Sequence, residues 1–334
     1  MSGRGSGAKP DPAWPYPRRV REFIRKAAAA VHLSVLLEGE TGTGKSYVAR
    51  AIHDQSPRAR EPFISANAPS FAPTLIQSEL YAHEKGAFTD ARDARVGLIG
   101  LARAGTLFLD EIGDLPPPIQ MHLLTVLEDR VFRRLGGTRE IVTEARFTFA
   151  TNRPMDELLR TGGFRSDLFY RVAQLRITLP PLRERLQDLE AIARCILVRE
   201  MAAGAETGPV PALAPDLLEA LRAYSWPGNV REYRNVLLNI WVESEGAPVL
   251  LLDHLPAHVL RVSPTADGAT APARRPRYVP PEDPVVERQM IVDALRLARG
   301  HQTAAAAALN MGRRTLWGRI RLYGIVEAEW LSAT

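Results

Sequence analysis

Cysteine is nearly absent from this chain of 334 residues, which has a single one, Cys195. One thiol cannot close a disulfide within the chain or build a cysteine cage around a metal. It falls in an apolar, helix-like stretch, residues 191–197, so we interpret it as a buried structural thiol. The seven histidines show no spacing typical of metal ligands, and we interpret them as structural or surface residues.

Long apolar runs are also missing. No stretch approaches the roughly 20 residues that a membrane-spanning helix needs. The Gly/Pro-rich residues 1–17 lack the apolar centre of a signal peptide. We therefore predict a soluble, cytoplasmic protein. The formal net charge of +5 permits nucleic-acid binding but does not demonstrate it.

Composition and periodicity divide the chain into five segments. Strand-like apolar runs alternate with helix-like segments over residues 19–180, which predicts a parallel α/β sheet. Residues 181–245 carry leucines at helical spacing and predict a small helical domain packed on the sheet. Residues 1–18 and 246–283 have the composition of a disordered N-terminus and a linker. Residues 284–328 are again helical and apolar and predict a small separate module.

A glycine-rich loop follows the first apolar strand. Residues 39–46 read GETGTGKS, which satisfies the pattern G-x-x-x-x-G-K-[ST] between a strand and a helix. Glycines let backbone N–H groups surround phosphates, and the N-terminus of the helix adds a favourable dipole. We expect Lys45 to reach the outer phosphates and Ser46 to support Mg²⁺. The predicted nucleotide-binding residues of this loop are Gly39, Glu40, Thr41, Gly42, Thr43, Gly44, Lys45 and Ser46.

Two acidic residues end a second apolar strand. Asp110 and Glu111 follow the run TLFL and are expected at the carboxyl edge of a parallel sheet, where ligands bind. Alone this pattern is weak, because ordinary strands often end in acids. Beside a phosphate-binding loop it predicts Asp110 as a ligand of Mg²⁺ and Glu111 as the group that polarises the attacking water.

Together these motifs resemble the AAA+ domain of the sigma-54-dependent activators, also called bacterial enhancer-binding proteins. The resemblance covers nearly everything from about residue 21 to residue 325. It implies a P-loop sheet core with a small helical lid that hydrolyses ATP with Mg²⁺. The resemblance also implies roles for further residues. Asn67 would be the partner of the catalytic glutamate, Asn152 would be sensor I, Arg165 and Arg171 would be arginine fingers, and Arg231 would be sensor II of the lid.

Arginine fingers would make the protein an oligomer. A guanidinium beside the transferred phosphoryl group can raise the rate by orders of magnitude. If Arg165 and Arg171 come from a neighbouring subunit, activity requires a closed ring with head-to-tail contacts, which the resemblance implies to be a hexamer. The alternative for both is an ordinary surface salt bridge in an arginine-rich chain.

A second sequence motif makes the resemblance to this family more specific. Residues 81–91 read YAHEKGAFTDA and resemble the GAFTGA loop, which in the family touches sigma-54. Asp90 stands where the family usually has its second glycine, and Ala82 replaces a frequent glycine. Aspartate adopts positive φ less readily than glycine and adds a negative charge, which puts the efficiency or partner of sigma engagement in question. Two alternatives are an ordinary surface loop and a degenerate loop that no longer uses sigma-54. The predicted contact residues are Gly86, Ala87, Phe88, Thr89, Asp90 and Ala91.

The C-terminal residues 302–325 predict two helices around a tight turn at residues 310–312. An alanine-dense helix followed by a basic one is the helix-turn-helix layout, and it resembles the Fis-type domain that ends many of these activators. Leu316 and Ile320 would lie on the buried side, and the preceding helix, residues 284–299, would dimerise the module. The alternative is a solvated basic helix with no DNA role. The predicted contacts with double-stranded DNA are Arg313, Arg314, Thr315 and Arg319.

The resemblance implies an activator that binds upstream DNA, assembles a ring and remodels closed complexes of sigma-54 RNA polymerase into open ones. Only about twenty residues precede the core, too few for a regulatory domain, so we expect control in trans by a partner protein or constitutive activity. Two alternatives stay open. One is a DNA-binding regulator of ordinary polymerase that uses ATP mainly to assemble, which Asp90 favours. The other is an unfoldase or helicase-loader relative, against which the GAFT-like loop and the helix-turn-helix argue.

Overall fold

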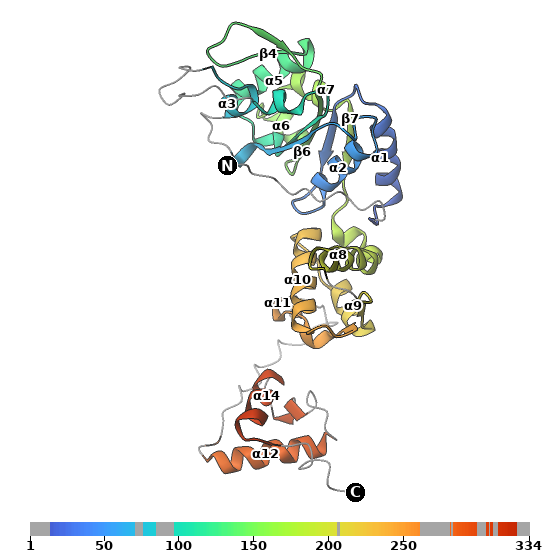
Figure 1. The fold of residues 1–334 in the computed structure, drawn as a ribbon, viewed down its shortest axis with the longest axis vertical. Coiled ribbons are helices and arrows are strands. Elements are labelled where there is room, and N and C mark those ends of the chain that lie inside the picture. The colour runs from blue at the N-terminus through green and yellow to red at the C-terminus, as the bar shows by residue number, and fades with distance from the viewer. Residues whose placement is uncertain are drawn as a thin grey trace. The chain divides into compact units, whose positions relative to one another are not determined.

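The computed structural model describes residues 14–70, 76–84, 97–205, 208–260, 281, 283–298, 305–306, 308–309 and 313–325. The chain forms two compact units, residues 1–264 and residues 265–334 (Figure 1). The predicted contact loop, residues 86–91, and the predicted turn at residues 310–312 lie outside the described residues.

The first unit is built on a five-stranded parallel sheet. Its strand order is β2-β3-β6-β1-β7. The strands are β1 (Val35–Glu38), β2 (Phe63–Asn67), β3 (Thr106–Asp110), β6 (Arg146–Thr151) and β7 (Leu175–Thr178). Because parallel sheets are covered on both faces, their strands are short apolar runs rather than alternating ones. The predicted parallel α/β class is confirmed.

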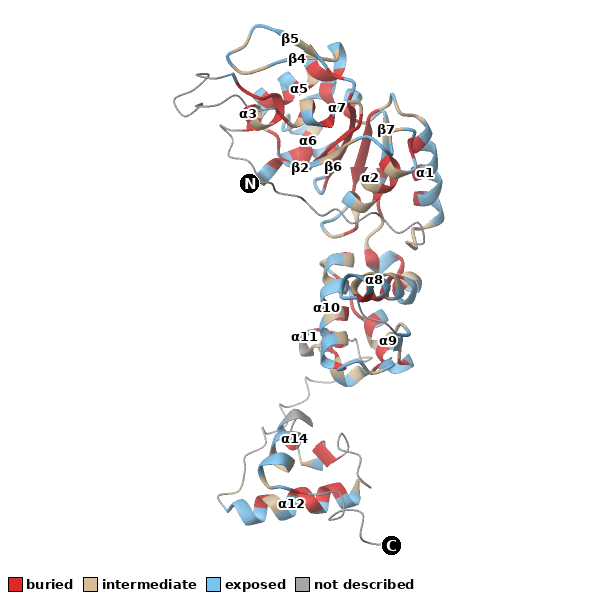
Figure 2. Cartoon of the chain, in the orientation of Figure 1, coloured by how far each residue is buried: buried red, intermediate tan, exposed pale blue. Residues whose placement is uncertain are grey.

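Two apolar clusters cover the two faces of the sheet. Successive residues of a strand point to opposite faces, so Leu36 joins one cluster while Val35 and Leu37 join the other. The cluster around Leu36 is completed by α3 (Ile76–Tyr81), α4 (Leu98–Ala102), α5 (Pro117–Asp129), α6 (Met155–Arg160) and α7 (Ser166–Val172). The opposite cluster is completed by α1 (Arg18–Ala29) and α2 (Lys45–Asp54). The buried positions follow the strands and the inner sides of these helices (Figure 2).

Short elements complete the sheet domain. A hairpin of β4 (Val131–Arg133) and β5 (Glu140–Val142) follows α5. The 3-10 turns η1 (Ala68–Ser70) and η2 (Ile112–Asp114) belong to the sheet domain, and η3 (Leu182–Glu184) and η4 (Leu186–Asp188) lead from β7 into the helical lid.

A helical lid follows the sheet domain. It contains α8 (Leu189–Ala203), α9 (Pro215–Ala223), α10 (Asn229–Glu243), η5 (Leu252–His254), α11 (Ala257–Leu260) and the short strands β8 (Ala212–Leu213) and β9 (Val249–Leu250). Trp226 is completely buried at its centre, with the rings of Tyr224 and Tyr233 set edge-on at 5.0 and 4.9 Å. Such edge-to-face contacts suit the quadrupoles of aromatic rings.

Two segment boundaries differ from the sequence-based ones. The structure places Leu250, Leu255 and Val259 in the apolar core of the lid, so the lid continues past residue 245, where we predicted a linker. These three apolar side chains are widely spaced in the sequence, so the composition of the segment suggested a linker. At the N-terminal end, Trp14 packs against the lid core and Tyr16 packs against the core of the sheet domain, although we predicted residues 1–18 to be disordered.

Several smaller expectations can be checked in the described residues. Cys195 lies on α8 and is only half-buried, so its side chain is more exposed than we predicted. The buried His53 and His83 bond to the hydroxyls of Thr106 and Ser78, as structural histidines do. Among the described helices, none is long and apolar enough to cross a membrane.

The second unit is small and helical. It contains α12 (Pro284–Leu297) and α14 (Arg313–Leu322). Its apolar core joins both helices through Ile291, Leu295 and Leu316 and includes Ala305 and Ala306 of the alanine-rich segment between them. Leu316 is completely buried and Ile320 packs against this core, as the helical spacing predicted.

Candidate nucleotide site

The glycine-rich loop spans residues 39–44 between β1 and α2. Gly42 and Gly44 have φ angles of +82° and +101°, which side-chain-bearing residues rarely adopt. Gly44 is also the left-handed residue from which α2 begins. The backbone therefore turns sharply enough to point the N-terminus of α2 into the space that the loop surrounds, which is the arrangement that binds phosphates.

Lys45 folds back across this loop. Its Nζ donates to the carbonyl oxygens of Gly39 and Glu40 at 2.8 and 3.3 Å, and the residue is only 6% exposed. Burial lowers the pKa of Lys45, while the carboxylates of Glu111 and Asp110 raise it. A partly desolvated cation next to two acids is well placed to exchange carbonyl oxygens for the oxygens of a phosphate.

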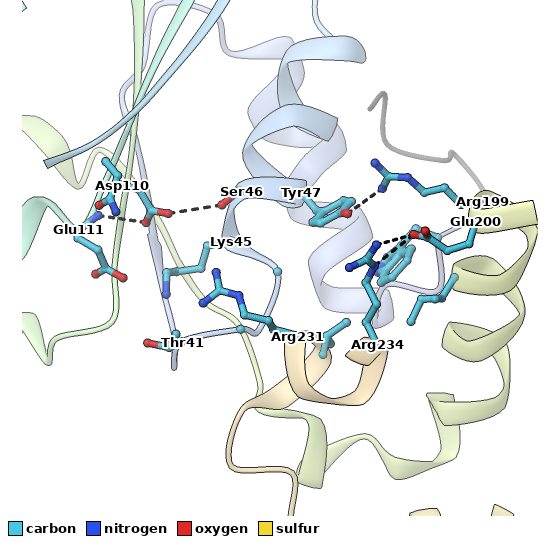
Figure 3. Close-up of a pocket in the computed structure, with 16 residues that line it drawn as sticks. Thr41, Lys45, Ser46, Tyr47, Asp110, Glu111, Arg199, Glu200, Arg231 and Arg234 are labelled. Carbon is cyan, nitrogen blue, oxygen red and sulfur yellow. Dashed lines mark hydrogen bonds and ion pairs between the residues drawn. The ribbon is translucent and has the colours of Figure 1, made fainter. Parts of the chain in front are cut away.

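The two predicted acids lie at the carboxyl end of β3, facing α2. The Ser46 hydroxyl donates to Oδ2 of Asp110 at 3.4 Å (Figure 3). One hydroxyl and one carboxylate, both of them hard oxygen donors, fit the preference of Mg²⁺ for oxygen ligands. Glu111 has a left-handed backbone, with φ +55° and ψ +47°. Burial raises the pKa of Glu111, which makes it a better proton acceptor than an exposed glutamate.

Asn152 connects this acid to the loop. Its backbone N–H donates to Oε2 of Glu111 at 2.9 Å, and its side-chain amide donates to the Thr41 hydroxyl at 3.1 Å. Asn67 ends β2 and pairs in register with Asp110. Asn152, the residue after β6, therefore holds Glu111 through its backbone, and the role that we assigned to Asn67 stays a prediction.

The lid contacts the loop through a polar cluster that we did not predict. Glu40 forms a two-pronged ion pair with Arg183 at 2.7 and 2.8 Å. The buried amide of Asn229 donates to Oε2 of Glu40 and to the carbonyl of Thr41, both at 3.1 Å. Hydrogen bonds from Arg183 and then Asn229 lower the pKa of Glu40 to about 2. Glu40 therefore connects the loop to the lid, although we predicted it as a nucleotide ligand.

The glycine-rich loop, the start of α2, the acids at the end of β3 and the lid line one cavity of about 340 Å³ (Figure 3). Asp110 and Glu111 lie at one end, Tyr47, Arg199, Glu200 and Arg234 lie at the other, and Lys45 and Arg231 lie between them. The predicted residues that line it are Thr41, Gly42, Gly44, Lys45, Ser46, Asn67, Asp110, Glu111 and Arg231. The lining residues that we did not predict are Trp14, Tyr47, Ile196, Arg199, Glu200, Val230 and Arg234.

Three family profiles match the chain in sequence order. The profile of the Sigma-54 interaction domain matches residues 16–178, that of the AAA+ ATPase lid domain residues 183–272, and that of the Fis family of bacterial regulatory proteins residues 284–323. The chain therefore contains a sigma-54 interaction domain of the AAA+ type, a AAA+ lid domain and a Fis-type module. The AAA+ core, the lid and the C-terminal Fis-type module predicted from the sequence are thereby confirmed.

Curated relatives match most of the chain. The regulatory protein AtoC of Escherichia coli is 39% identical over 297 residues, which cover 89% of this chain and 64% of AtoC. The transcriptional regulator NtrC of Salmonella typhimurium is 39% identical over 321 residues, covering 88% of this chain and 66% of NtrC. The chain therefore spans just under two thirds of the length of these relatives.

Solved structures are similar to the chain in fold. The crystal structure of NtrX from Brucella abortus in complex with ADP has a TM-score of 0.66 and 27% identity, and covers 92% of this chain and 68% of NtrX. The complex of NtrX with ATP has a TM-score of 0.63 at the same identity, covering 92% of this chain and 67% of NtrX.

The candidate arginine fingers of this AAA+ chain lie away from its own cavity. Arg165 pairs with Asp167 at 2.6 Å, and Arg171 pairs with Glu128 at 3.1 Å. Both arginines are about half-exposed at the two ends of α7, and neither lines the cavity. Exposed ion pairs of this kind contribute little to stability, so both guanidinium groups can be released for another partner.

Two backbone hydrogen bonds anchor the segment that leads into the predicted sigma-contact loop. Ala82 has a φ of +75°, which explains why glycine is favoured at this position. The backbone N–H of Leu135 donates to the carbonyl of Ala82 at 3.0 Å. The backbone N–H of Glu84 donates to the carbonyl of Leu135, also at 3.0 Å. This segment is thereby held against the residues between β4 and β5.

The predicted DNA contacts lie on α14 of the second unit. Thr315 is exposed, and the side chains of Arg313 and Arg314 lie outside the described residues. Arg319 forms an ion pair at 3.2 Å with Glu287 of α12, which is only 2% exposed. Arg319 therefore neutralises a buried carboxylate, a structural role that we did not predict for it.

A close approach between Gly42 and the lid gives a prediction. A Cβ at Gly42 would lie 2.3 Å from the carbonyl oxygen of Gly228, whereas a Cβ at Gly44 would meet nothing within 4 Å. Both positions have positive φ, so the backbone of an alanine is strained at each. At Gly42 the added Cβ would also collide with the backbone of Gly228. We expect Gly42→Ala to lower the thermal unfolding midpoint by at least about 4 °C more than Gly44→Ala, measured by calorimetry. Equal losses for the two variants would contradict this prediction.

Proposed function

We propose that this chain is an ATP-hydrolysing transcription activator that binds upstream DNA and converts closed complexes of sigma-54 RNA polymerase into open ones. One observation carries the proposal. The phosphate-binding loop, the acids of β3 and Arg231 of the lid converge on one cavity, in a chain that also contains a sigma-54 interaction domain and a Fis-type module.

The residues of the cavity suit hydrolysis of a nucleoside triphosphate bound with Mg²⁺. The loop N–H groups and Lys45 bind the phosphates, and Ser46 and Asp110 hold the cation that neutralises phosphate charge. Glu111 orients a water and accepts its proton, aided by its raised pKa. Arg231 reaches the nucleotide from the lid, so that hydrolysis changes the contacts between lid and loop.

The remaining parts couple this chemistry to transcription. Arg165 and Arg171 complete the site of a neighbouring subunit, so the active form is a ring in which each nucleotide lies between two chains. The C-terminal unit binds double-stranded DNA through α14. Phe88 and Thr89 of the contact loop transmit the change at the nucleotide to sigma-54.

The deciding experiment is open-complex formation on a sigma-54 promoter with purified protein, polymerase and ATP. We expect the wild type to open the promoter, and Thr89→Ala to hydrolyse ATP at about the wild-type rate yet open less than about a tenth as much, because it lacks only the contact at the loop tip. Thr89→Ser, which keeps the hydroxyl, serves as the matched control.

A second candidate function follows from Asp90, which stands where the family usually has glycine. If the wild type hydrolyses ATP but opens nothing, while Asp90→Gly opens the promoter, the contact loop has lost its partner. The chain would then be an ATP-dependent DNA-binding regulator of ordinary polymerase.

A further inference from the structure

Two cations lie close together in the middle of the cavity. Lys45 belongs to the loop and Arg231 to α10 of the lid (Figure 3). Burial lowers the pKa of Lys45, and the positive charge of Arg231 lowers it further. Like charges repel each other, most strongly where they are partly removed from water. Other contacts are therefore needed to hold the start of α10 against the loop.

The first residue of α10 supplies one set of these contacts. Asn229 is completely buried and has a φ of +52°. Its side-chain oxygen accepts from the backbone N–H of Leu182 at 2.8 Å, while its amide group donates to Glu40 and to the carbonyl of Thr41. These three hydrogen bonds fix the orientation of the amide. The start of α10 is thereby tied both to the loop and to the segment that leads into the lid.

The carboxylate of Glu40 brings in a second part of the lid segment. Arg183 of η3 donates to both of its oxygens, and each of the two side chains is 44% exposed. An isolated exposed ion pair contributes little, but here the fork of the guanidinium matches both oxygens and one oxygen is shared with the buried amide of Asn229. We call Glu40, Arg183 and Asn229 the lid clamp.

We propose that the lid clamp positions Arg231 for the nucleotide, so that Glu40 and Arg183 are positioning residues of ATP hydrolysis. Arg231 follows Asn229 by two residues on the same helix and lines the cavity, whereas none of the three clamp residues does. The inference rests on the proposed function, in which Arg231 reaches the nucleotide from the lid. The clamp offsets the repulsion between Lys45 and Arg231 before the phosphates arrive. Misplacing a group at a reacting centre by roughly 1 Å can cost about a hundredfold in rate.

The test asks whether Arg183 acts through Arg231. In the whole chain, Arg183→Ala and Arg231→Ala are compared with the variant that carries both changes. The measurements are kcat/KM for ATP and the affinity for ATP, obtained by displacement of fluorescent N-methylanthraniloyl ATP. Arg183→Lys keeps the charge but not the fork. Glu140→Gln is the matched control, because it breaks another exposed ion pair, with Arg133 at 2.6 Å, and Glu140 does not line the nucleotide cavity.

We expect Arg231→Ala to lower kcat/KM by about a hundredfold and Arg183→Ala by about tenfold. The double variant should lie within about twofold of Arg231→Ala, since the clamp then has no arginine left to position. Arg183→Lys should recover roughly a third of the wild-type value, because a lysine binds only one carboxylate oxygen well. Glu140→Gln should stay within about twofold of the wild type. The affinities for ATP should show the same non-additive pattern.

Independent effects would overturn the proposal. If the double variant loses about a thousandfold, the product of the two single losses, Arg183 does not act through Arg231. An Arg183→Ala variant that matches the wild type in both assays also contradicts it. Should Arg183→Ala fail to fold, Glu40→Gln removes the charge from the other side of the clamp, and the same pattern is expected with Arg231→Ala.

Failure of the ATPase function has a different outcome. If the wild type binds the fluorescent nucleotide but does not hydrolyse ATP, the proposed function fails. The displacement assays then still decide the inference, because coupling between Arg183 and Arg231 is measured in the affinity for ATP. If hydrolysis is normal and the two changes are additive in both assays, only the role of the lid clamp fails.

Discussion

Glu111→Gln is expected to lower ATP turnover by at least about a hundredfold while ATP binding stays within about threefold of the wild type. Burial raises the pKa of Glu111, so its carboxylate accepts a proton from water more readily than an exposed one, and an amide cannot accept it at all. The loop and Lys45, which bind the phosphates, are unchanged. Single-turnover hydrolysis and displacement of the fluorescent nucleotide measure the two effects separately.

The matched control is Asp114→Asn, three residues along the same segment. Asp114 pairs with Arg153 at 3.2 Å and does not line the cavity. If Asp114→Asn lowers turnover as much as Glu111→Gln, the effect is one of local structure or charge. If Glu111→Gln hydrolyses ATP at more than a few per cent of the wild-type rate, another group activates the water.

Arg171→Ala is expected to lower turnover by about a thousandfold at any protein concentration, and a mixture of inactive variants is expected to recover activity. In an equal mixture of Arg171→Ala with Glu111→Gln, a site that takes Glu111 from one chain and Arg171 from the next is complete. Random assembly makes about a quarter of the sites complete, because each site joins two chains head to tail. Steady-state ATPase assays of each variant alone and of the mixture measure this recovery.

The geometry is the reason for expecting this group from a neighbouring chain. Arg171 pairs with Glu128 on the outside of α7, away from the cavity of the same chain. Arg165→Ala should lower ATP turnover in the same way as Arg171→Ala. Arg160 is an exposed arginine on α6, and Arg160→Ala should keep wild-type turnover. If the mixture recovers nothing while both chains assemble, Arg171 acts within its own subunit or is structural.

The sequence alone was sufficient to predict the phosphate end of the site. The loop depends on a local requirement for positive φ, which glycine satisfies at positions 42 and 44, and on a strand that leads into a helix. Asp110 and Glu111 reach the same cavity because carboxyl ends of parallel strands share one edge of the sheet. The loop follows from residues close together along the chain, whereas its meeting with Asp110 and Glu111, 64 residues beyond Ser46 in the case of Asp110, follows from a general property of parallel sheets.

Other assignments needed the folded chain. Glu40 belongs to the loop motif, yet it bonds to Arg183 and Asn229, which are 143 and 189 residues away in sequence. Arg319 appeared as a surface cation for DNA, yet it pairs with a buried carboxylate of another helix. Composition assigned residues after 245 to a linker, although Leu250, Leu255 and Val259 complete the lid core.

The sequence by itself thus determined the class of chemistry, because a phosphate-binding loop is encoded by short-range backbone geometry. Only the tertiary structure decided how the other end of the cavity is built. Tyr47 and Arg199 are 152 residues apart, and Trp14 reaches them from a proline-rich segment without periodicity. Their meeting depends on how the lid packs against α2, and burial of apolar surface between distant segments leaves no local pattern to read.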